Sequence, residues 1–440
     1  MSVSGFSVGI YTLGCKVNQY ESEAIAEELV LQGAQILPPS SLCDVYIINT
    51  CTVTAESDRK ARQFIRRAIR KNPSAYILVI GCFSQVSPDD VAKIEGVDYI
   101  AGNANKGRVA EIASELVRRG QKNITPYVDV KPADSMGFEP MRITRFDRTR
   151  AYVKIEDGCE NKCAYCIIPS ARGSVRSKNP VEIIEEVRGL VQNGCSEVVL
   201  TGIETASYGK DLQNYTLADL LREVDQIPNI RRIRLGSLDP SLMKQDFVDR
   251  IASLRHLAPH FHLSMQSGSD HILALMKRKY NRRMALEGIQ RLRKAFPDAQ
   301  FTTDMIVGFP QEAEEDFDQS VQFIKEANFL MVHVFPYSKR KGTVAAQMSG
   351  QIAESVKHER VAQLSSVAAI TRESILDSMV GKTVEVLFET HESQTVYGHT
   401  AEFIEVSAHS DRPLCGSYGK VHIKSNDGTR CIGTLLTNEE

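Results

Sequence analysis

The sequence has no excess of positive charge and no hydrophobic run long enough to span a membrane. Lysine and arginine number 53 against 55 aspartates and glutamates, a net charge of −2, which excludes a general attraction to nucleic acid. Any contact with RNA must therefore come from local basic patches. Met1 to Gly14 lacks the charged start and long apolar run of a signal peptide. We therefore expect a cytoplasmic protein with no membrane partner.

Cysteine is also scarce, because ten residues in 440 are too few for a scaffold built from disulfides. In a reducing compartment, cysteines that cluster are more often metal ligands or catalysts than bridges. Their positions relative to the predicted strands are therefore the most informative feature of the sequence.

The length of 440 residues predicts two or three domains. From residue 6 to about 120, short apolar runs alternate with amphipathic helical patterns. The apolar runs lie at 7–13, 45–49 and 76–80, and the helical patterns lie at 21–32 and 57–71. This alternation predicts βαβ units and a parallel sheet over residues 1–125.

Residues 126–148 interrupt the alternation and, with three prolines and few apolar positions, predict a linker. The βα alternation resumes over residues 149–378 and predicts a complete or partial (β/α) barrel, with its active site at the C-terminal ends of the strands. Residues 379–440 hold short strand patterns without helices, which predicts a small all-β barrel. The expected class is α/β with an all-β C-terminal domain.

Three cysteines lie close together after a predicted strand, in the segment Cys159-Glu-Asn-Lys-Cys163-Ala-Tyr-Cys166. Three thiolates can surround one compact metal site and leave one coordination position open, as a catalytic cluster requires. The alternative is a structural zinc knuckle that takes a distant fourth ligand.

A second set of three cysteines is dispersed in the sequence, but each member follows a predicted strand. Cys15, Cys51 and Cys82 end the apolar runs of the first domain. Because the ends of parallel strands meet at one edge of the sheet, we expect the three thiols to converge there. The alternative is a coincidence among buried cysteines. Two sites of three thiolates suggest two iron–sulfur clusters.

With both cysteine sets, the sequence resembles the methylthiotransferase family of radical S-adenosylmethionine enzymes over nearly its whole length. The resemblance implies two [4Fe-4S] clusters and S-adenosylmethionine as cofactors. It assigns the radical cluster to Cys159, Cys163 and Cys166, and the auxiliary cluster to Cys15, Cys51 and Cys82. All six would then be catalytic residues as well as metal ligands. The C-terminal segment resembles the small RNA-binding β-barrel (TRAM) that ends these enzymes.

Within that family, residues 12–22 resemble the branch that acts on threonylcarbamoyl-adenosine in tRNA. That branch implies addition of a methylthio group to carbon 2 of the adenosine beside the anticodon. The partners would be the tRNA anticodon loop, an unidentified electron donor and an unidentified sulfur donor. Isopentenyl-adenosine tRNA and an aspartate of a ribosomal protein stay open as alternative substrates. The C-terminal segment has nine Asp/Glu and five Lys/Arg after residue 380, so it suits a basic protein partner at least as well as RNA and keeps the ribosomal protein open.

Two other classes would lack part of this pattern. A radical RNA methylase would not need Cys15, Cys51 and Cys82. A zinc-dependent RNA-binding protein would be colourless, whereas an iron–sulfur protein purified without air is brown.

The resemblance also implies contacts to S-adenosylmethionine at the ends of the barrel strands. The candidates are Gly202, Glu204, Arg234, Ser237, Gln266 and Asp304. A glycine beside an acid or amide at the mouth of a barrel suits close approach to a ribose and an amino-acid tail.

One helical pattern carries a basic stripe that could bind RNA phosphates. Arg59, Arg62, Arg66 and Arg70 recur at helical spacing on one face. A solvated helix face is the alternative. Further basic runs lie at 142–150 and 277–283, and Tyr397, Phe403 and Tyr418 are aromatic candidates for stacking on bases.

Overall fold

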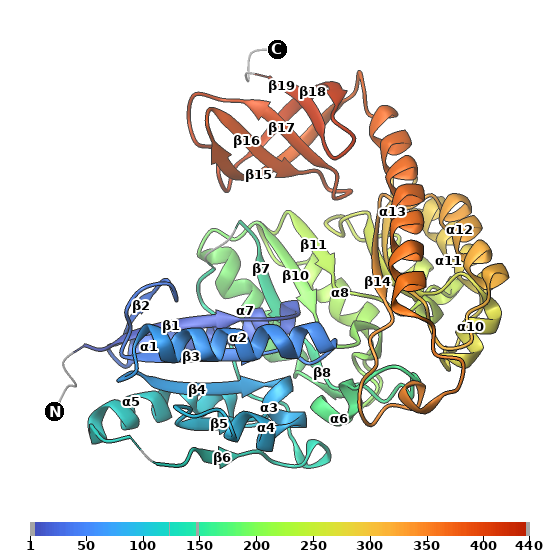
Figure 1. Ribbon diagram of the computed structural model, residues 1–440. Helices are drawn as coiled ribbons and strands as arrows, with labels where there is room; N and C mark the ends of the chain where they lie inside the picture. The colour runs from blue at the N-terminus through green and yellow to red at the C-terminus, as the bar shows by residue number, and fades with distance from the viewer. Residues whose placement is uncertain (1–4, 123, 147–148, 437–440) are drawn as a thin grey trace.

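The computed structural model describes residues 5–122, 124–146 and 149–436. The chain forms an N-terminal α/β domain, a central α/β barrel and a C-terminal β-barrel, which are blue to teal, green to orange and red in Figure 1. None of the helices in the described ranges has both the length and the apolar character that crossing a bilayer requires.

The N-terminal domain is a six-stranded parallel sheet in the order β2-β1-β3-β4-β5-β6. Its strands are β1 (Ser7–Thr12), β2 (Gln35–Leu37), β3 (Val45–Thr50), β4 (Tyr76–Gly81), β5 (Tyr99–Ala101) and β6 (Tyr127–Asp129). Its helices are α1 (Lys16–Leu31), α2 (Ala55–Lys71), α3 (Cys82–Val86), α4 (Pro88–Ala92) and α5 (Val109–Arg119). The residues of β3 and β4 are buried on both faces, as parallel sheets require.

The N-terminal sheet extends beyond the boundary predicted at residue 125. Tyr127, Val128 and Asp129 pair with β5 as the edge strand β6, although they lie in the predicted linker. Three residues are too few for a periodic pattern in the sequence, and only the pairing with β5 identifies them as a strand.

The central domain is a partial barrel of two parallel three-stranded sheets, β7-β10-β11 and β12-β13-β14. The sheets meet where Leu238 bridges to Leu263. Within the described ranges no pairing joins β7 to β14, so the barrel is open on that side. Its strands are β7 (Ala151–Lys154), β10 (Glu197–Thr201), β11 (Arg232–Leu235), β12 (His260–Gln266), β13 (Gln300–Val307) and β14 (Met331–Pro336), with a short hairpin of β8 (Glu156–Asp157) and β9 (Arg176–Ser177).

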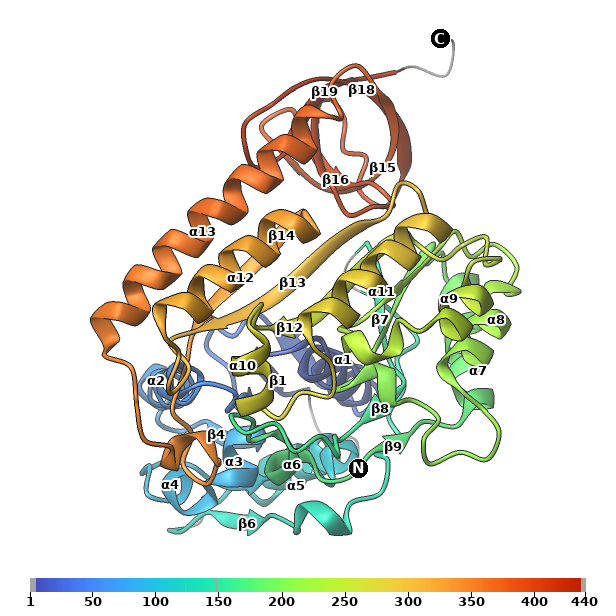
Figure 2. The same cartoon turned by 90° about the vertical axis from the view of Figure 1, so that its right-hand side faces the viewer.

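Helices cover the outer face of the partial barrel. They are α7 (Pro180–Gln192), α8 (Leu217–Asp225), α9 (Gln245–Ile251), α10 (Asp270–Leu275), α11 (Arg282–Ala295), α12 (Glu314–Ala327) and α13 (Glu354–Asp377). The short α6 (Ile168–Arg172) packs against α3 of the N-terminal domain instead. Figure 2 shows α11, α12 and α13 outside β12, β13 and β14. α7 begins with Asn179 as its N-cap, whose side chain accepts a hydrogen bond from the Val181 N–H, and with Pro180 at its first helical position.

The predicted C-terminal barrel is confirmed as a closed barrel in the order β15-β16-β17-β19-β18. Its strands are β15 (Thr383–Glu392), β16 (Thr395–His399), β17 (Glu405–His409), β18 (Tyr418–Asn426) and β19 (Cys431–Leu435). Ile375 and Leu376 at the end of α13 pack into its core. The long α13 helix therefore connects the two barrels through a shared apolar contact.

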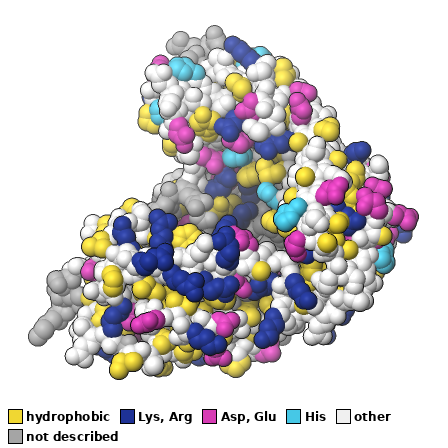
Figure 3. All heavy atoms as spheres, viewed as in Figure 1, with side chains coloured by type: hydrophobic (Ala, Val, Ile, Leu, Met, Phe, Trp, Pro, Cys, Tyr) yellow, Lys and Arg dark blue, Asp and Glu magenta, His cyan; other side chains and the backbone are white. Residues whose placement is uncertain are grey.

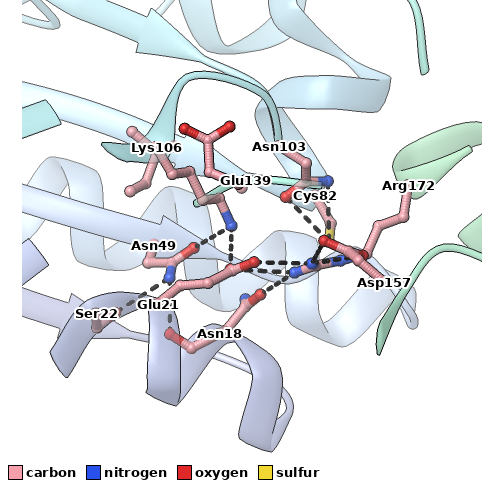
Figure 4. Close-up of polar contacts among 12 residues, drawn as sticks. Asn18, Glu21, Ser22, Asn49, Cys82, Asn103, Lys106, Glu139, Asp157 and Arg172 are labelled. Atoms are coloured by element: carbon pink, nitrogen blue, oxygen red, sulfur yellow. Dashed lines mark hydrogen bonds and ion pairs between the residues drawn. The ribbon is translucent and has the colours of Figure 1, made fainter. Parts of the chain in front are cut away.

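A buried ion network joins the N-terminal domain to the partial barrel (Figure 4). The Glu21 carboxylate, from α1, lies 2.8 Å from Lys154 Nζ on β7 and 2.9 Å from Arg172 Nη1 on α6, and it also pairs with Lys106. Asp157 accepts from Lys154 at 2.6 Å and from Arg172 at 3.0 Å. Every side chain of the network is at most 3% exposed.

Burial alone would raise the pKa of Glu21, but Arg172, Lys106 and Lys154 hold it well below its usual range. The carboxylate is therefore charged at neutral pH and offsets cations from both domains. This network fixes α1 against the open side of the barrel, where α1 and β7 pack together.

We expect Glu21→Gln to destabilise the protein by about 3–5 kcal/mol, because it leaves buried cations with insufficient negative charge. The measurement is the urea midpoint of unfolding. Glu115→Gln is the matched control, since its partner Arg119 is 68% exposed and such surface pairs contribute about 1 kcal/mol or less. Equal shifts for the two variants would contradict a structural role of the network.

Candidate active site

Cys15, Cys51 and Cys82 lie at the C-terminal ends of β1, β3 and β4, which are neighbours in the sheet. Gly14 permits their approach. Its φ is +100°, and a Cβ there would lie 2.9 Å from the Cys51 sulfur. Burial raises the pKa of the Cys51 thiol to about 12, with further contributions from Cys82 and Cys15. The structure thus brings the dispersed cysteines together at one sheet edge.

Cys159, Cys163 and Cys166 lie in the loop that follows β8. Gly158 begins the loop with φ +86°, and a Cβ there would lie 1.9 Å from the Ser174 carbonyl oxygen. Two donors face the sulfurs: the Ile168 N–H lies 3.4 Å from Cys166 Sγ, and Arg278 Nη1 lies 3.1 Å from Cys163 Sγ. Donors directed at sulfur suit thiolates that carry negative charge.

Both cysteine sets have the donor chemistry of iron–sulfur ligands, because such clusters are held by cysteine thiolates. In the described part of the chain, no three His, Cys, Asp or Glu side chains are arranged around one metal ion. All six cysteines are free thiols.

Polar side chains without partners lie beside the Cys159 loop. Within the described residues, Glu204 Oε1, Glu156 Oε1 and Thr205 Oγ1 are buried and have no hydrogen-bond partner. The other Glu204 oxygen accepts from Asn161 Nδ2 at 3.3 Å. Burial and the nearby Asp239 raise the pKa of Glu204 to about 7, against the effect of Arg278. Unpaired buried polar atoms are costly, and here they fit a bound polar ligand such as S-adenosylmethionine.

A cavity of about 550 Å³ lies where the three parts of the chain meet. Its walls include Cys15 and Lys16 from the N-terminal domain, Arg150, Gly202, Arg234, Ser237, His260, His262, Thr302, Asp304 and His333 from the central part, and Phe403 from the C-terminal barrel. Figure 3 shows the hollow between the C-terminal barrel and the N-terminal domain, with basic and histidine side chains inside it. The cavity extends from the Cys15 edge of the sheet into the partial barrel, where its lining includes the first residues of β12 and β14 as well as Gly202 and Ser237 beyond the C-terminal ends of β10 and β11. Cys159, Cys163 and Cys166 are not among its lining residues.

Four of the six predicted cofactor contacts line the cavity. Three of these are Gly202, Ser237 and Asp304. Glu204 lies beside the cysteine loop instead, and Gln266 ends β12 at a bulge with φ +68°. Their contact with S-adenosylmethionine stays a prediction.

Arg234 also lines the cavity, but its donors are already engaged. It donates to Glu197 Oε1 at 2.7 Å and to the carbonyl oxygens of Thr400 and Ala401 at 2.7 and 2.8 Å. The structure therefore shows Arg234 holding the C-terminal barrel, while a role in cofactor binding stays a prediction.

The basic stripe divides within α2. Arg59 pairs with Glu56, and Arg62 lies over the Phe83 ring at 5.3 Å. Arg66 and Arg70 are exposed and, in the described part of the chain, form no ion pair. With Arg67 they line a surface hollow of about 430 Å³. Figure 3 shows this basic face below the central hollow.

Arg278 belongs to the basic run at 277–283 that is predicted to be available to RNA, but its side chain is buried. It pairs with Asp239 at 2.7 Å and contacts Cys163. The spacing of basic residues does not show which of them faces inward.

The aromatic candidates of the C-terminal barrel are partly engaged within the chain. Phe403 stacks on His260 and His399, with ring centroids 4.6 and 4.5 Å away. Tyr418 lies under Arg231, whose guanidinium carbon is 3.6 Å from the ring centre. Arg430 lies over Tyr397 at 5.1 Å.

Comparisons with known proteins agree with these features. The Radical SAM superfamily matches residues 153–324, and the uncharacterized protein family UPF0004 matches residues 7–102. The chain is 38% identical over 424 residues to the threonylcarbamoyladenosine tRNA methylthiotransferase MtaB of Bacillus subtilis strain 168, which covers 95% of this chain and 93% of that protein. A protein of the same name from Aquifex aeolicus strain VF5 is 37% identical, over 86% and 92% of the two chains.

Similar sequences also include proteins named for another substrate. A tRNA-2-methylthio-N(6)-dimethylallyladenosine synthase of Acetivibrio thermocellus is 35% identical over 94% of this chain and 88% of that protein. Among solved structures, the radical S-adenosylmethionine methyltransferase TsrM of Kitasatospora setae aligns with a TM-score of 0.56 at 12% identity, covering 78% and 77% of the chains. This structural likeness supports the fold.

We expect Glu204→Gln to weaken the binding of S-adenosylmethionine about tenfold, because the unpaired carboxylate oxygen would lose its attraction for the ligand's amino group. The measurement is equilibrium dialysis of the cofactor against anaerobically reconstituted protein, with iron content determined in parallel. Glu160→Gln, exposed in the same loop, is the matched control. Unchanged affinity in Glu204→Gln would show that the unpaired Glu204 oxygen does not bind S-adenosylmethionine.

Proposed function

The chain belongs to the methylthiotransferase family of radical S-adenosylmethionine enzymes, and on that basis we propose that it methylthiolates carbon 2 of threonylcarbamoyl-adenosine beside the anticodon of tRNA. The observation that supports the chemistry is the cavity between the Cys15 edge of the sheet and the interior of the partial barrel. The relatives named for threonylcarbamoyl-adenosine, at up to 38% identity, support the substrate.

The proposal requires two [4Fe-4S] clusters. Cys159, Cys163 and Cys166 would hold the one that binds S-adenosylmethionine, and Cys15, Cys51 and Cys82 would hold the auxiliary one. The bound groups supply a radical that opens an unactivated C–H bond and a methylthio group that replaces the hydrogen, which side chains cannot do. Replacement of hydrogen by this group requires a sulfur donor and an electron donor as partners.

The protein's own residues would position these groups and exclude water. Arg278 compensates charge at Cys163 and is itself held by Asp239. Phe403 closes the cavity from the C-terminal barrel. A cavity shielded on several sides protects reactive species from solvent.

The tRNA would bind across the hollow of Figure 3. Arg66 and Arg70 on α2 are placed to contact phosphates on the N-terminal side. A base in an anticodon loop is unpaired, so turning it into the cavity costs less than extraction from a duplex.

The defining experiment is nucleoside mass spectrometry after anaerobic incubation with S-adenosylmethionine, a reductant and modified tRNA. We expect a methylthio mass gain with tRNA carrying threonylcarbamoyl-adenosine and none with tRNA carrying isopentenyl-adenosine. Gain only with the second tRNA would contradict the substrate and retain the chemistry. No gain with either, while 5′-deoxyadenosine still forms, would favour the ribosomal protein.

Two cysteine variants separate the roles of the sites in the same assay. Cys163→Ala should abolish formation of 5′-deoxyadenosine. Cys51→Ala should retain it and lose methylthio transfer. Transfer by the Cys51 variant would disprove the division of labour between the two sites.

For RNA binding, we expect the double variant Arg66→Ala, Arg70→Ala to weaken tRNA affinity and to lower the salt slope of log K by about 1–2, because up to two phosphate contacts are lost. The measurement is filter binding at several salt concentrations. Arg188→Ala on α7, also exposed, is the control. An unchanged slope in the double variant would identify the stripe as a solvated helix face.

A further inference from the structure

Lys16 is the cationic residue of the cavity wall that has no ion pair in the described part of the chain. It is the first residue of α1, directly after Cys15, and its side chain is accessible from the cavity. The other charged groups of the wall are engaged: Arg150 pairs with Glu197 and Glu389, Arg234 pairs with Glu197, and Asp304 pairs with His262. The Lys16 ammonium is therefore available to a ligand.

The surroundings of Lys16 favour an anion. Arg150 and Arg234 share the cavity wall with Lys16 and repel its charge, while Asp304 and Cys15, in the same wall, each attract it more weakly than either arginine repels it. The N-terminus of the 16-residue helix α1 adds positive potential, since its first turn contains no acidic side chain and its N-cap forms no side-chain hydrogen bond. A carboxylate that entered here would relieve the repulsion among the cations.

The two candidate substrate adenosines differ in the charge of the group that they carry. A threonylcarbamoyl group ends in a carboxylate that is ionised at neutral pH, whereas an isopentenyl group is wholly apolar. An apolar group beside Lys16 would exclude water from the ammonium without replacing its hydrogen bonds, which is unfavourable. A cation at this position therefore both attracts the first substrate and rejects the second.

We propose that Lys16 binds the carboxylate of the threonylcarbamoyl group and is a specificity-determining residue of this enzyme. The inference rests on the proposed function and identifies the residue that distinguishes the proposed substrate from the alternative one. Lys16 is not required for folding, because α1 is anchored by the buried residues Val17, Asn18 and Tyr20 instead. Substitution at this position should therefore leave the fold intact.

The experiment uses the full-length protein and three anticodon stem-loop RNAs that differ only in the group on N6 of the target adenosine. The groups are threonylcarbamoyl, its neutral methyl ester, and isopentenyl. Dissociation constants come from fluorescence anisotropy, and initial rates come from nucleoside mass spectrometry. The acid and the ester have nearly the same shape, so their comparison isolates the negative charge.

We expect the wild type to bind the acid at least tenfold more tightly than the ester, a typical ratio for a charged hydrogen bond. Lys16→Gln should lose this preference by weakening the acid alone. Lys16→Arg should retain most of it. Lys294→Gln, an exposed position near the end of α11, should behave as the wild type.

Retention of the preference by Lys16→Gln would overturn the inference. Equal weakening of all three RNAs, or a loss of iron and of visible absorption, would also overturn the inference. Either result would show that Lys16 supports the site at its neighbour Cys15 instead. Failure of the wild type to turn over the threonylcarbamoyl RNA would contradict the proposed function instead. In that case the binding arms still decide whether Lys16 reads a carboxylate.

Discussion

The structure depends on the Glu21 carboxylate, which binds three cations contributed by two domains. Glu21 lies little more than one helical turn after Lys16, so its anchoring also fixes the start of α1. That start carries Cys15 into the cavity wall. Arg172 and Cys15 are close enough to interact electrostatically. One buried contact thus sets the relative position of the sheet edge and the open side of the barrel.

Much of the fold could be predicted from the sequence because its strands are short apolar runs between helices. The runs that form β3 and β4 are wholly buried, and their sequences are therefore mostly hydrophobic from end to end. The choice between a complete and a partial barrel could not be made. Pairing between β7 and β14, like the packing of α1 against β7, is a contact between distant segments that leaves no periodic signal in the sequence. The edge strand β6 was missed because pairing, not composition, makes it a strand.

The candidate site was predictable where position along a strand determines position in space. Cys15, Cys51 and Cys82 were located by this rule, since parallel strands end at one edge. Side-chain direction was not predictable. Arg278 is buried against Cys163 although it belongs to a basic run, and Arg234 holds backbone carbonyls of the C-terminal barrel. In both cases a distant partner decides the role, and the sequence does not identify that partner.

The position of Phe403 has a consequence for the order of events. This ring is held between His260 and His399 and forms part of the cavity wall, so under the proposed function the C-terminal barrel is a component of the reaction chamber. A recognition module that merely tethered RNA could be exchanged for another of similar affinity. Here an exchanged module would also have to supply a ring of the right size at one position. Under the proposed function, a change in the C-terminal barrel at this ring would alter the cavity as well as RNA recognition.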